Sequence, residues 1–134
     1  KDRFAQKIID HFRGDLTGKK IAILGWAFKA NTNDSRESAA IYVAEKLYKA
    51  GAILEIYDPK VSIDQIQKDL KFNWKEKSIE LDRICISSNI LFGNCDAVAI
   101  LTEWEGFKSI DYSKTLVFDG RGVVSSSNYS IGKG

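Results

Sequence analysis

An apolar run at residues 21–24 is followed by a polar loop, residues 25–38, and then by apolar residues at helical spacing. A strand, a polar loop and a helix N-terminus together form the usual anion-binding corner of an α/β sheet. The loop adds two cations, Lys29 and Arg36, and the aromatic ring of Phe28. These residues suit a phosphorylated ligand with a flat ring, although a plain connection with scattered charges explains the loop alone slightly better.

The loop departs from the Gly-x-Gly-x-x-Gly fingerprint of dinucleotide-binding folds. Ala27 and Ala30 stand where the second and third glycines would be. The second glycine of that fingerprint lets the backbone touch the pyrophosphate. We therefore expect side-chain cations, rather than the backbone, to make most of the contacts with a ligand.

Strands and helices alternate along the chain. The apolar spacing predicts helices at residues 2–13, 36–50 and 63–70, and strands at residues 20–24, 53–57, 83–87, 97–101, 116–118 and 129–131. This pattern predicts an α/β fold of the Rossmann-like, three-layer, doubly wound type, with a mostly parallel sheet of about five to six strands in the order 3-2-1-4-5-6. Asp34 and Glu37 have the spacing of a capping box, which predicts the start of the second helix.

Composition argues against several classes of partner. The 134 residues suit one domain, and 20 basic against 18 acidic residues give no reason to expect nucleic acid or a membrane surface as a partner. The sequence has neither a membrane-spanning apolar run nor a signal peptide, so we expect a cytoplasmic protein. Cys85 and Cys95 lack metal-binding spacing and the chain has one histidine, so we expect no metal site and two buried, reduced thiols.

The predicted topology brings three loops to one edge of the sheet. Ligands of such folds lie beyond the C-terminal strand ends, where the winding reverses between the first and fourth strands. The residues that would meet there are Phe28, Lys29, Arg36, Thr102, Glu103, Trp104, Gly120 and Arg121. Their convergence favours a bound phosphate ester. Asp58, after the second strand, could accept a ribose hydroxyl or cap its Asp-Pro turn, and we favour the turn.

Five short motifs occur in order along the chain. They are GWAFK at residues 25–29, DSRES at 34–38, IYDPK at 56–60, LTEW at 101–104 and FDGR at 118–121. Together they resemble the C-terminal, UDP-binding domain of the UDP-glucose/GDP-mannose dehydrogenase family, and most of all its UDP-glucose 6-dehydrogenase branch. The resemblance covers nearly the whole chain. It implies that residues 1–14 are the end of an interdomain helix and residues 15–134 the UDP-binding domain.

The resemblance also implies roles for individual residues. Phe28, Lys29 and Arg121 match substrate-binding positions of the family. Arg36 matches an arginine that reaches NAD across the interdomain cleft. Glu103 and Trp104 belong to a family motif, and we expect them to support the crevice without a certain contact to the ligand.

Enzymes of this branch oxidise UDP-glucose to UDP-glucuronate in two NAD-dependent steps. Their catalytic cysteine, catalytic lysine and NAD fingerprint lie in preceding domains, so the resemblance implies no catalytic residue in this chain and no catalysis by the chain alone. NAD would be bound mainly by the N-terminal domain. The implied partners are UDP-glucose or UDP-glucuronate, the upstream domains and, for the full-length protein, further copies in a homo-oligomer.

Two features of the chain extend this interpretation. Phe4, Ile8 and Phe12 form a stripe that an upstream domain would cover, so we expect an exposed apolar surface there. The links at residues 112–116 and after Val124 are shorter than those that the resemblance implies. Either segments have been deleted near the C-terminus of the domain, or residues are missing from this sequence. Both alternatives leave the order of the last strands and the placement of Arg121 open.

Other functions stay open at this point. A sister enzyme that uses UDP-N-acetylmannosamine or GDP-mannose shares the motifs at residues 56–60 and 101–104, whereas the loop at 25–38 favours the UDP-glucose branch. A non-enzymatic nucleotide-binding or assembly module is the alternative from another class.

Overall fold

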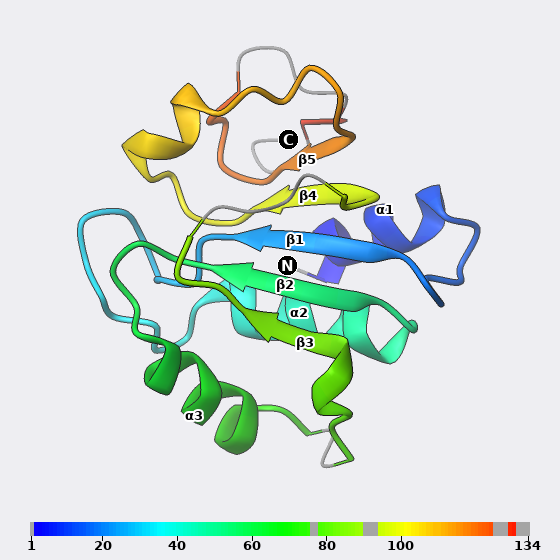
Figure 1. Ribbon diagram of the computed structural model, residues 1–134, viewed down its shortest axis with the longest axis horizontal. Coiled ribbons are helices and arrows are strands. Elements are labelled where there is room, and N and C mark those ends of the chain that lie inside the picture. The colour runs from blue at the N-terminus through cyan, green and yellow to red at the C-terminus, as the bar shows by residue number, and fades with distance from the viewer. Residues whose placement is uncertain (1, 76–77, 90–93, 125–128, 131–134) are drawn as a thin grey trace.

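The computed structural model of the chain describes residues 2–75, 78–89, 94–124 and 129–130, and it is an α/β fold (Figure 1). Its helices are α1 (Asp2–His11), α2 (Ala39–Lys49) and α3 (Ile63–Asn73), with 3-10 helices η1 (Leu81–Arg83) and η2 (Glu105–Ser109). Its strands are β1 (Lys20–Leu24), β2 (Ile53–Tyr57), β3 (Ile84–Ile86), β4 (Ala97–Ile100), β5 (Val117–Asp119) and β6 (Tyr129–Ser130).

The six strands form one sheet in the order β3-β2-β1-β4-β5-β6, and every neighbouring pair is parallel. The predicted strand order and the Rossmann-like α/β class are therefore confirmed. The winding reverses between β1 and β4, so the loops that follow these two strands leave the sheet side by side, at the left in Figure 1. This places the residues expected at the site along one edge of the sheet.

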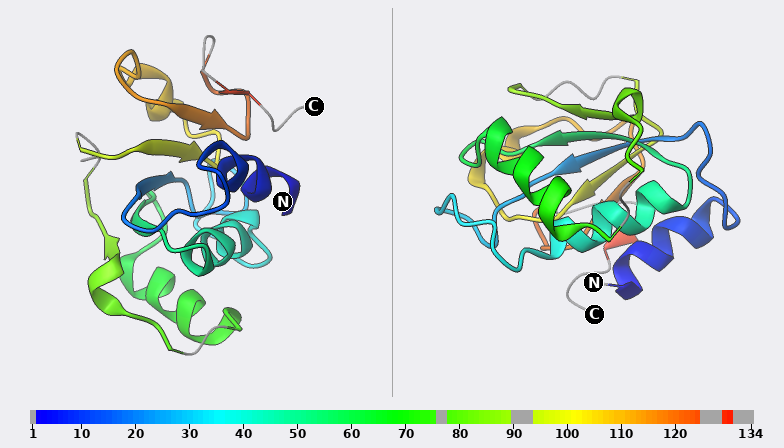
Figure 2. Two further views of the ribbon diagram at one scale, coloured as in Figure 1. Left: turned by 90° about the vertical axis from the view of Figure 1, so that its right-hand side faces the viewer. Right: turned by 90° about the horizontal axis from the view of Figure 1, so that it is seen from below.

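The three α-helices lie along one face of the sheet (Figure 2), with α2 in contact with both α1 and α3. Among the described residues, therefore, no α-helix forms the third layer that the sequence predicted on the other face. The opposite face is nevertheless covered, because successive residues of β1 such as Ala22 and Ile23 are both buried. Connecting segments provide this cover. The ring of Phe107, in η2, is buried and lies 6.3 Å from the ring of Tyr57 at the end of β2.

The second helix begins later than the sequence predicted. Its N-cap is Ser38, whose side chain accepts a hydrogen bond from the backbone N–H of Ala40, and the capping box of Asp34 and Glu37 is wrong. Both Asp34 and Ser38 are good N-cap residues, and the choice between them is made by tertiary contacts. The side chain of Ser35 is bonded to α3, which keeps residues 34–37 in the loop.

The apolar stripe of α1 packs inside the molecule. Phe4 and Ile8 are 8% and 0% exposed, so the expected exposed surface at the N-terminus is wrong. Phe4 lies against the turn after β5, where a Cβ added to Gly120 would come within 3.2 Å of the phenyl ring. The ring of His11, at the end of the helix, lies 5.7 Å from the ring of Phe118 in β5, and the buried apolar residues of the helix are part of the core of this chain.

The two cysteines are free and only one of them is shielded. Cys85 is exposed, which contradicts the expected burial, because β3 is the edge strand and its flanking isoleucines take the face toward the helices. Cys95 is half-buried, and burial raises the pKa of its thiol.

Candidate functional site

The carboxylate of Asp58, directly after β2, holds three loops together. Its Oδ2 accepts hydrogen bonds from the backbone N–H groups of Trp26 (2.7 Å) and Ala27 (2.9 Å) in the loop after β1. The same oxygen accepts a bond from the indole nitrogen of Trp104 (3.0 Å) in the loop after β4. A single buried carboxylate therefore fixes the start of the loop at residues 25–38.

The second oxygen of Asp58 closes its own turn. Oδ1 accepts bonds from the backbone N–H groups of Lys60 (2.8 Å) and Val61 (3.0 Å), which confirms the predicted Asp-Pro turn. Asp58 is buried and both of its oxygens are engaged, which leaves the ribose-hydroxyl alternative without support.

A second buried carboxylate, Asp69 of α3, anchors the same loop further along. Its Oδ2 accepts bonds from the indole nitrogen of Trp26 (2.9 Å) and the hydroxyl of Ser35 (2.6 Å). Its Oδ1 accepts a bond from the side-chain amide of Gln65 (2.9 Å). The loop is thus held at both of its ends, which reduces the entropy that a ligand would have to remove from it.

The loop leaves β1 through a close approach that requires glycine. Gly25 has a φ of 102°, and an added Cβ would lie 2.5 Å from the side chain of Thr102. The Thr102 hydroxyl in turn donates to the carbonyl oxygen of Ala27 at 2.9 Å. The loops after β1 and β4 are therefore in direct contact where they leave the sheet.

Glu103 joins the loops that follow β1 and β5. Its Oε1 accepts the backbone N–H of Ala30 at 2.8 Å, and its Oε2 accepts a bond from Nη2 of Arg121. Partial burial works to raise the pKa of Glu103, but the bonds from Ala30 and Arg121 and the positive charge of the guanidinium outweigh it and lower the pKa. The carboxylate is therefore held in its charged form.

Arg121 is held at its backbone as well as at its guanidinium group. Its backbone N–H donates to Oδ1 of Asp119 at 3.0 Å, and Oδ2 of Asp119 accepts the N–H of Val124 at 2.7 Å. Asp119 is fully buried at the end of β5. Arg121 therefore projects from a rigid turn, with part of its side chain exposed toward the loop after β1.

Phe28 and Lys29 lie at the exposed part of the same loop. The ring of Phe28 is 51% exposed, and the loop beneath it is closed by a 2.7 Å bond from the Phe28 N–H to the carbonyl oxygen of Asp34. Lys29 is exposed, and within the described part of the chain its ammonium group has no ion-pair partner. Both side chains are thus free to contact a ligand.

Arg36 lies on another side of the loop. Its guanidinium forms a two-pronged pair with Asp34, at 3.1 Å from Nε and 3.0 Å from Nη2. Hydrogen bonds from the side chain and backbone of Arg36 lower the pKa of Asp34 to about 2. The two residues border a polar hollow of about 570 Å³ that Gln65 of α3 also lines, away from the contact between Glu103 and Arg121.

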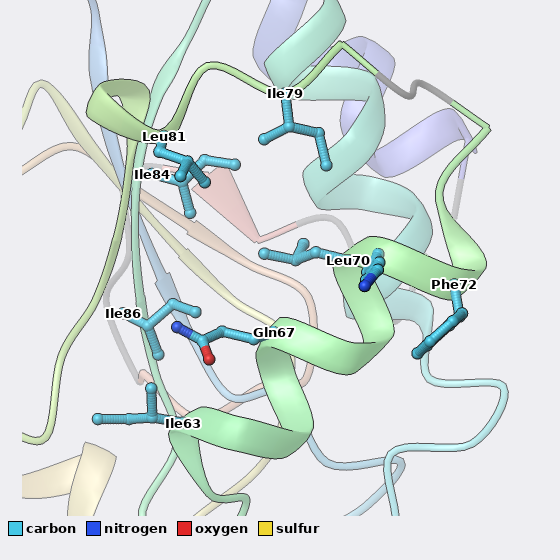
Figure 3. Close-up of a pocket in the computed structure, with 9 residues that line it drawn as sticks. Ile63, Gln67, Leu70, Phe72, Ile79, Leu81, Ile84 and Ile86 are labelled. Atoms are coloured by element: carbon cyan, nitrogen blue, oxygen red, sulfur yellow. The ribbon is translucent and has the colours of Figure 1, made fainter.

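An apolar groove of about 720 Å³ lies between α3 and the edge strand β3 (Figure 3). Ile84 and Ile86 line it from β3, and Leu70 from α3. Two residues that line it, Phe72 (70%) and Leu81 (81%), are more exposed than any other large apolar residue of the described part of the chain. Its lining is apolar apart from Gln67 and Lys71, which suits a phosphate poorly, and it is separate from the loops that Asp58 and Glu103 join.

Sequence reasoning named Asp58 only as the cap of its Asp-Pro turn. It missed the bonds from Asp58 to the loop after β1 and the second buried carboxylate, Asp69. Asp69 follows Ile66 by three residues, on the buried side of a predicted amphipathic helix, and a carboxylate there needs a partner. Trp26 and Trp104 gave the corresponding signal, because a buried indole N–H usually finds an acceptor. These three residues together predict buried hydrogen bonds between loops.

The described residues contain no group of three or more His, Cys, Asp or Glu side chains placed to hold a metal ion. None of the helices among them has both the length and the apolar character that crossing a membrane requires.

Comparison with known proteins agrees with the motifs. A family model, described as the UDP binding domain of the UDP-glucose/GDP-mannose dehydrogenase family, matches residues 22–126. The UDP-glucose 6-dehydrogenase of Bos taurus is 44% identical over 133 residues, which cover 91% of this chain and 27% of the relative. UDP-glucose 6-dehydrogenase 1 of Arabidopsis thaliana is 38% identical over 162 residues, which cover 99% of this chain and 34% of the relative.

The chain spans about a quarter to a third of the length of the curated relatives it matches. Among solved structures, a UDP-glucose dehydrogenase from Pyrobaculum islandicum has a TM-score of 0.72 and 27% identity, over 96% of this chain and 29% of that one. A UDP-D-ManNAc dehydrogenase from Pyrococcus horikoshii has a TM-score of 0.60 over 95% of this chain and 28% of that one, and at 20% identity it supports the fold alone.

Proposed function

Because the chain belongs to the UDP-glucose/GDP-mannose dehydrogenase family, as its UDP binding domain, we propose that the loops after β1, β4 and β5 hold the UDP part of a nucleotide sugar. One observation carries the proposal most directly. Glu103 bonds Ala30 and Arg121, and so brings the exposed Phe28–Lys29 segment and the FDGR turn to one edge of the sheet. This is the edge at which doubly wound folds bind their ligands.

The chemistry of the exposed groups fits a nucleoside diphosphate. The half-exposed ring of Phe28 offers an apolar face on which a uracil can lie. Lys29 and Arg121 supply positive charge for the two phosphates, and the guanidinium can pair two phosphate oxygens at once. Because both cations stand beside an anchored loop, binding would order few additional residues.

We propose UDP-glucose as the sugar nucleotide, and oxidation to UDP-glucuronate as the activity of the full-length protein. The proposal is supported by relatives of 37–44% identity that carry the name UDP-glucose 6-dehydrogenase. The chemical step would use a cysteine and a lysine outside this chain, since neither Cys85 nor Cys95 lies in the loops of the site.

NAD, the hydride acceptor of this proposed reaction, would make few contacts with this chain. Ala27 has a methyl group where the dinucleotide fingerprint has its second glycine, so a pyrophosphate could not approach the backbone closely there. Arg36 is the residue that fits a contact with NAD, and its guanidinium is already shared with Asp34. We therefore propose one peripheral contact to NAD from this chain and binding of the cofactor mainly by other domains.

Calorimetric titration tests the proposal on the chain of 134 residues, which builds one continuous core. We expect UDP and UDP-glucose to bind with similar modest affinity, and NAD to bind more weakly than either. GDP-mannose and UDP-N-acetylmannosamine serve as comparison ligands for the sister enzymes. Tighter binding of NAD than of UDP would contradict the proposed site. Tighter binding of GDP-mannose than of UDP-glucose would indicate that the chain belongs to the GDP-mannose branch of the family.

A further inference from the structure

The carboxylate of Glu103 lies among the residues proposed to bind a diphosphate. An uncompensated negative charge there would repel the ligand, because like charges a few ångströms apart interact unfavourably even near a protein surface. The carboxylate is compensated from two sides, by the N–H of Ala30 and by the guanidinium of Arg121. Its presence at this position therefore needs an explanation in terms of the residues it touches.

Among the described residues, the contact with Glu103 leaves part of the Arg121 guanidinium without a partner. Glu103 accepts from Nη2, while within the described residues Nε and Nη1 have no hydrogen-bond acceptor. Because a guanidinium is a planar fork of five donors, a carboxylate on one side leaves other donors available to a phosphate. The side chain of Arg121 is 36% exposed, so solvent, and hence a ligand, can reach it.

We propose that Glu103 is a positioning residue, which orients Arg121 toward a diphosphate bound at the Phe28–Lys29 loop and fixes that loop at Ala30. This inference rests on the proposed function. Glu103 touches the ligand only through Arg121 and Ala30. In the opposite role, a phosphate displaces Glu103 from Arg121. The carboxylate would then stay bonded to Ala30 and lie beside the phosphate, where the two negative charges repel each other.

Titration of the chain with UDP distinguishes the two roles. We expect Glu103→Gln to bind UDP about tenfold more weakly than the wild type, the loss typical of one charge-assisted hydrogen bond. Glu105→Gln is the matched control, because it makes the same change of charge two residues away. Its carboxylate is exposed and is paired with Lys108 outside the site, so its affinity for UDP should equal that of the wild type.

A double-mutant cycle separates positioning from a general effect on the fold. Glu103 acts on the ligand through Arg121. The Glu103→Gln change should therefore reduce UDP affinity much less in the Arg121→Gln variant than in the wild type. Thermal unfolding of each variant is followed in parallel. Should Glu103→Gln fail to fold, Glu103→Asp replaces it, since its shorter side chain keeps the charge but cannot reach both Ala30 and Arg121, and the same loss is expected.

The outcomes separate this inference from the proposed function. UDP binding by Glu103→Gln that equals or exceeds that of the wild type would overturn the positioning role and leave the proposed function intact. The positioning role would also be overturned if Glu103→Gln reduced UDP affinity as much in the Arg121→Gln variant as in the wild type. Failure of the wild-type chain to bind UDP would overturn the proposed function and this inference with it.

Discussion

The indole nitrogen of Trp104 donates a hydrogen bond to Oδ2 of Asp58 at 3.0 Å, and this bond joins the loop after β4 to the turn after β2. The two residues are 46 positions apart in the sequence. Between them lies the start of the loop after β1, whose N–H groups at Trp26 and Ala27 bond the same oxygen. The exposed residues proposed to bind a ligand therefore stand on a buried polar support.

Replacing Asp58 by asparagine tests how much this support contributes. An amide has one acceptor oxygen where the carboxylate has two, so buried N–H groups lose their partner. We expect the free energy of unfolding to fall by about 2–4 kcal/mol, the usual range for broken networks of buried hydrogen bonds. Urea denaturation measures it. Asp82→Asn is the control, because Asp82 is exposed and should change stability little. Equal stability of the two variants would contradict the central role of Asp58.

The strands and their order were predictable from the sequence. The runs at β1 and β4 are continuously apolar because these central strands are buried on both faces, and the alternation with helices sets parallel winding. The edge strand β3 shows the limit of that signal. Its isoleucines read as a buried strand, but only one face is covered, and Cys85 on the other face is exposed.

The contacts between loops were less predictable. Asp34 and Ser38 are equally good N-caps by residue type, and the bond of Ser35 to Asp69 decides between them. The pair of Glu103 and Arg121 depends on the side-chain conformations of two loops that follow adjacent strands. Topology predicts that these loops are neighbours, but it does not predict which oxygen meets which donor.

Gly25→Ala tests the close approach of the loops after β1 and β4. Alanine at a φ of 102° is strained, and its Cβ would lie 2.5 Å from the side chain of Thr102. We expect a loss of at least about 2 kcal/mol in unfolding free energy, from backbone strain and overpacking together. Gly106→Ala is the matched control, since no atom lies within 4 Å of its added Cβ. A stable Gly25→Ala variant would show that the loop can shift away from Thr102.

Ile8→Ala tests the packing of the N-terminal helix. Because Ile8 is fully buried, we expect a loss of about 2–4 kcal/mol on denaturation, as for other large-to-small core substitutions. Phe72→Ala, on another helix, removes a larger but exposed side chain and should cost little. Phe72→Ala should also reduce the binding of an apolar dye, since Phe72 borders the groove between α3 and β3. A reversed order of the two stability losses would contradict this packing.

The lowered pKa of Glu103 predicts a dependence of stability on pH. A carboxylate whose pKa falls on folding stabilises the fold above its ordinary pKa of 4.5, and this stabilisation is lost as the pH falls through the folded value. Denaturation curves should therefore give the wild type a larger free energy of unfolding than Glu103→Gln near neutral pH. The difference should stay level from neutral pH to just above the ordinary pKa of 4.5 and shrink as the pH falls further. A difference that also stays constant below that pKa would mean that Glu103 makes no stabilising charge interaction.

The last prediction compares Arg121 with Lys29 in UDP binding. Arg121 is fixed by Asp119 at its backbone and by Glu103 at its guanidinium, so Arg121→Lys loses a positioned fork of donors and retains a mobile point charge. We expect most of the UDP affinity to be lost, at a cost of about 1–3 kcal/mol. Lys29→Arg keeps the charge on an exposed part of the loop and should lose little. Titration with UDP, together with thermal unfolding, checks both variants. Unchanged UDP affinity in a folded Arg121→Lys variant would show that Arg121 does not bind UDP.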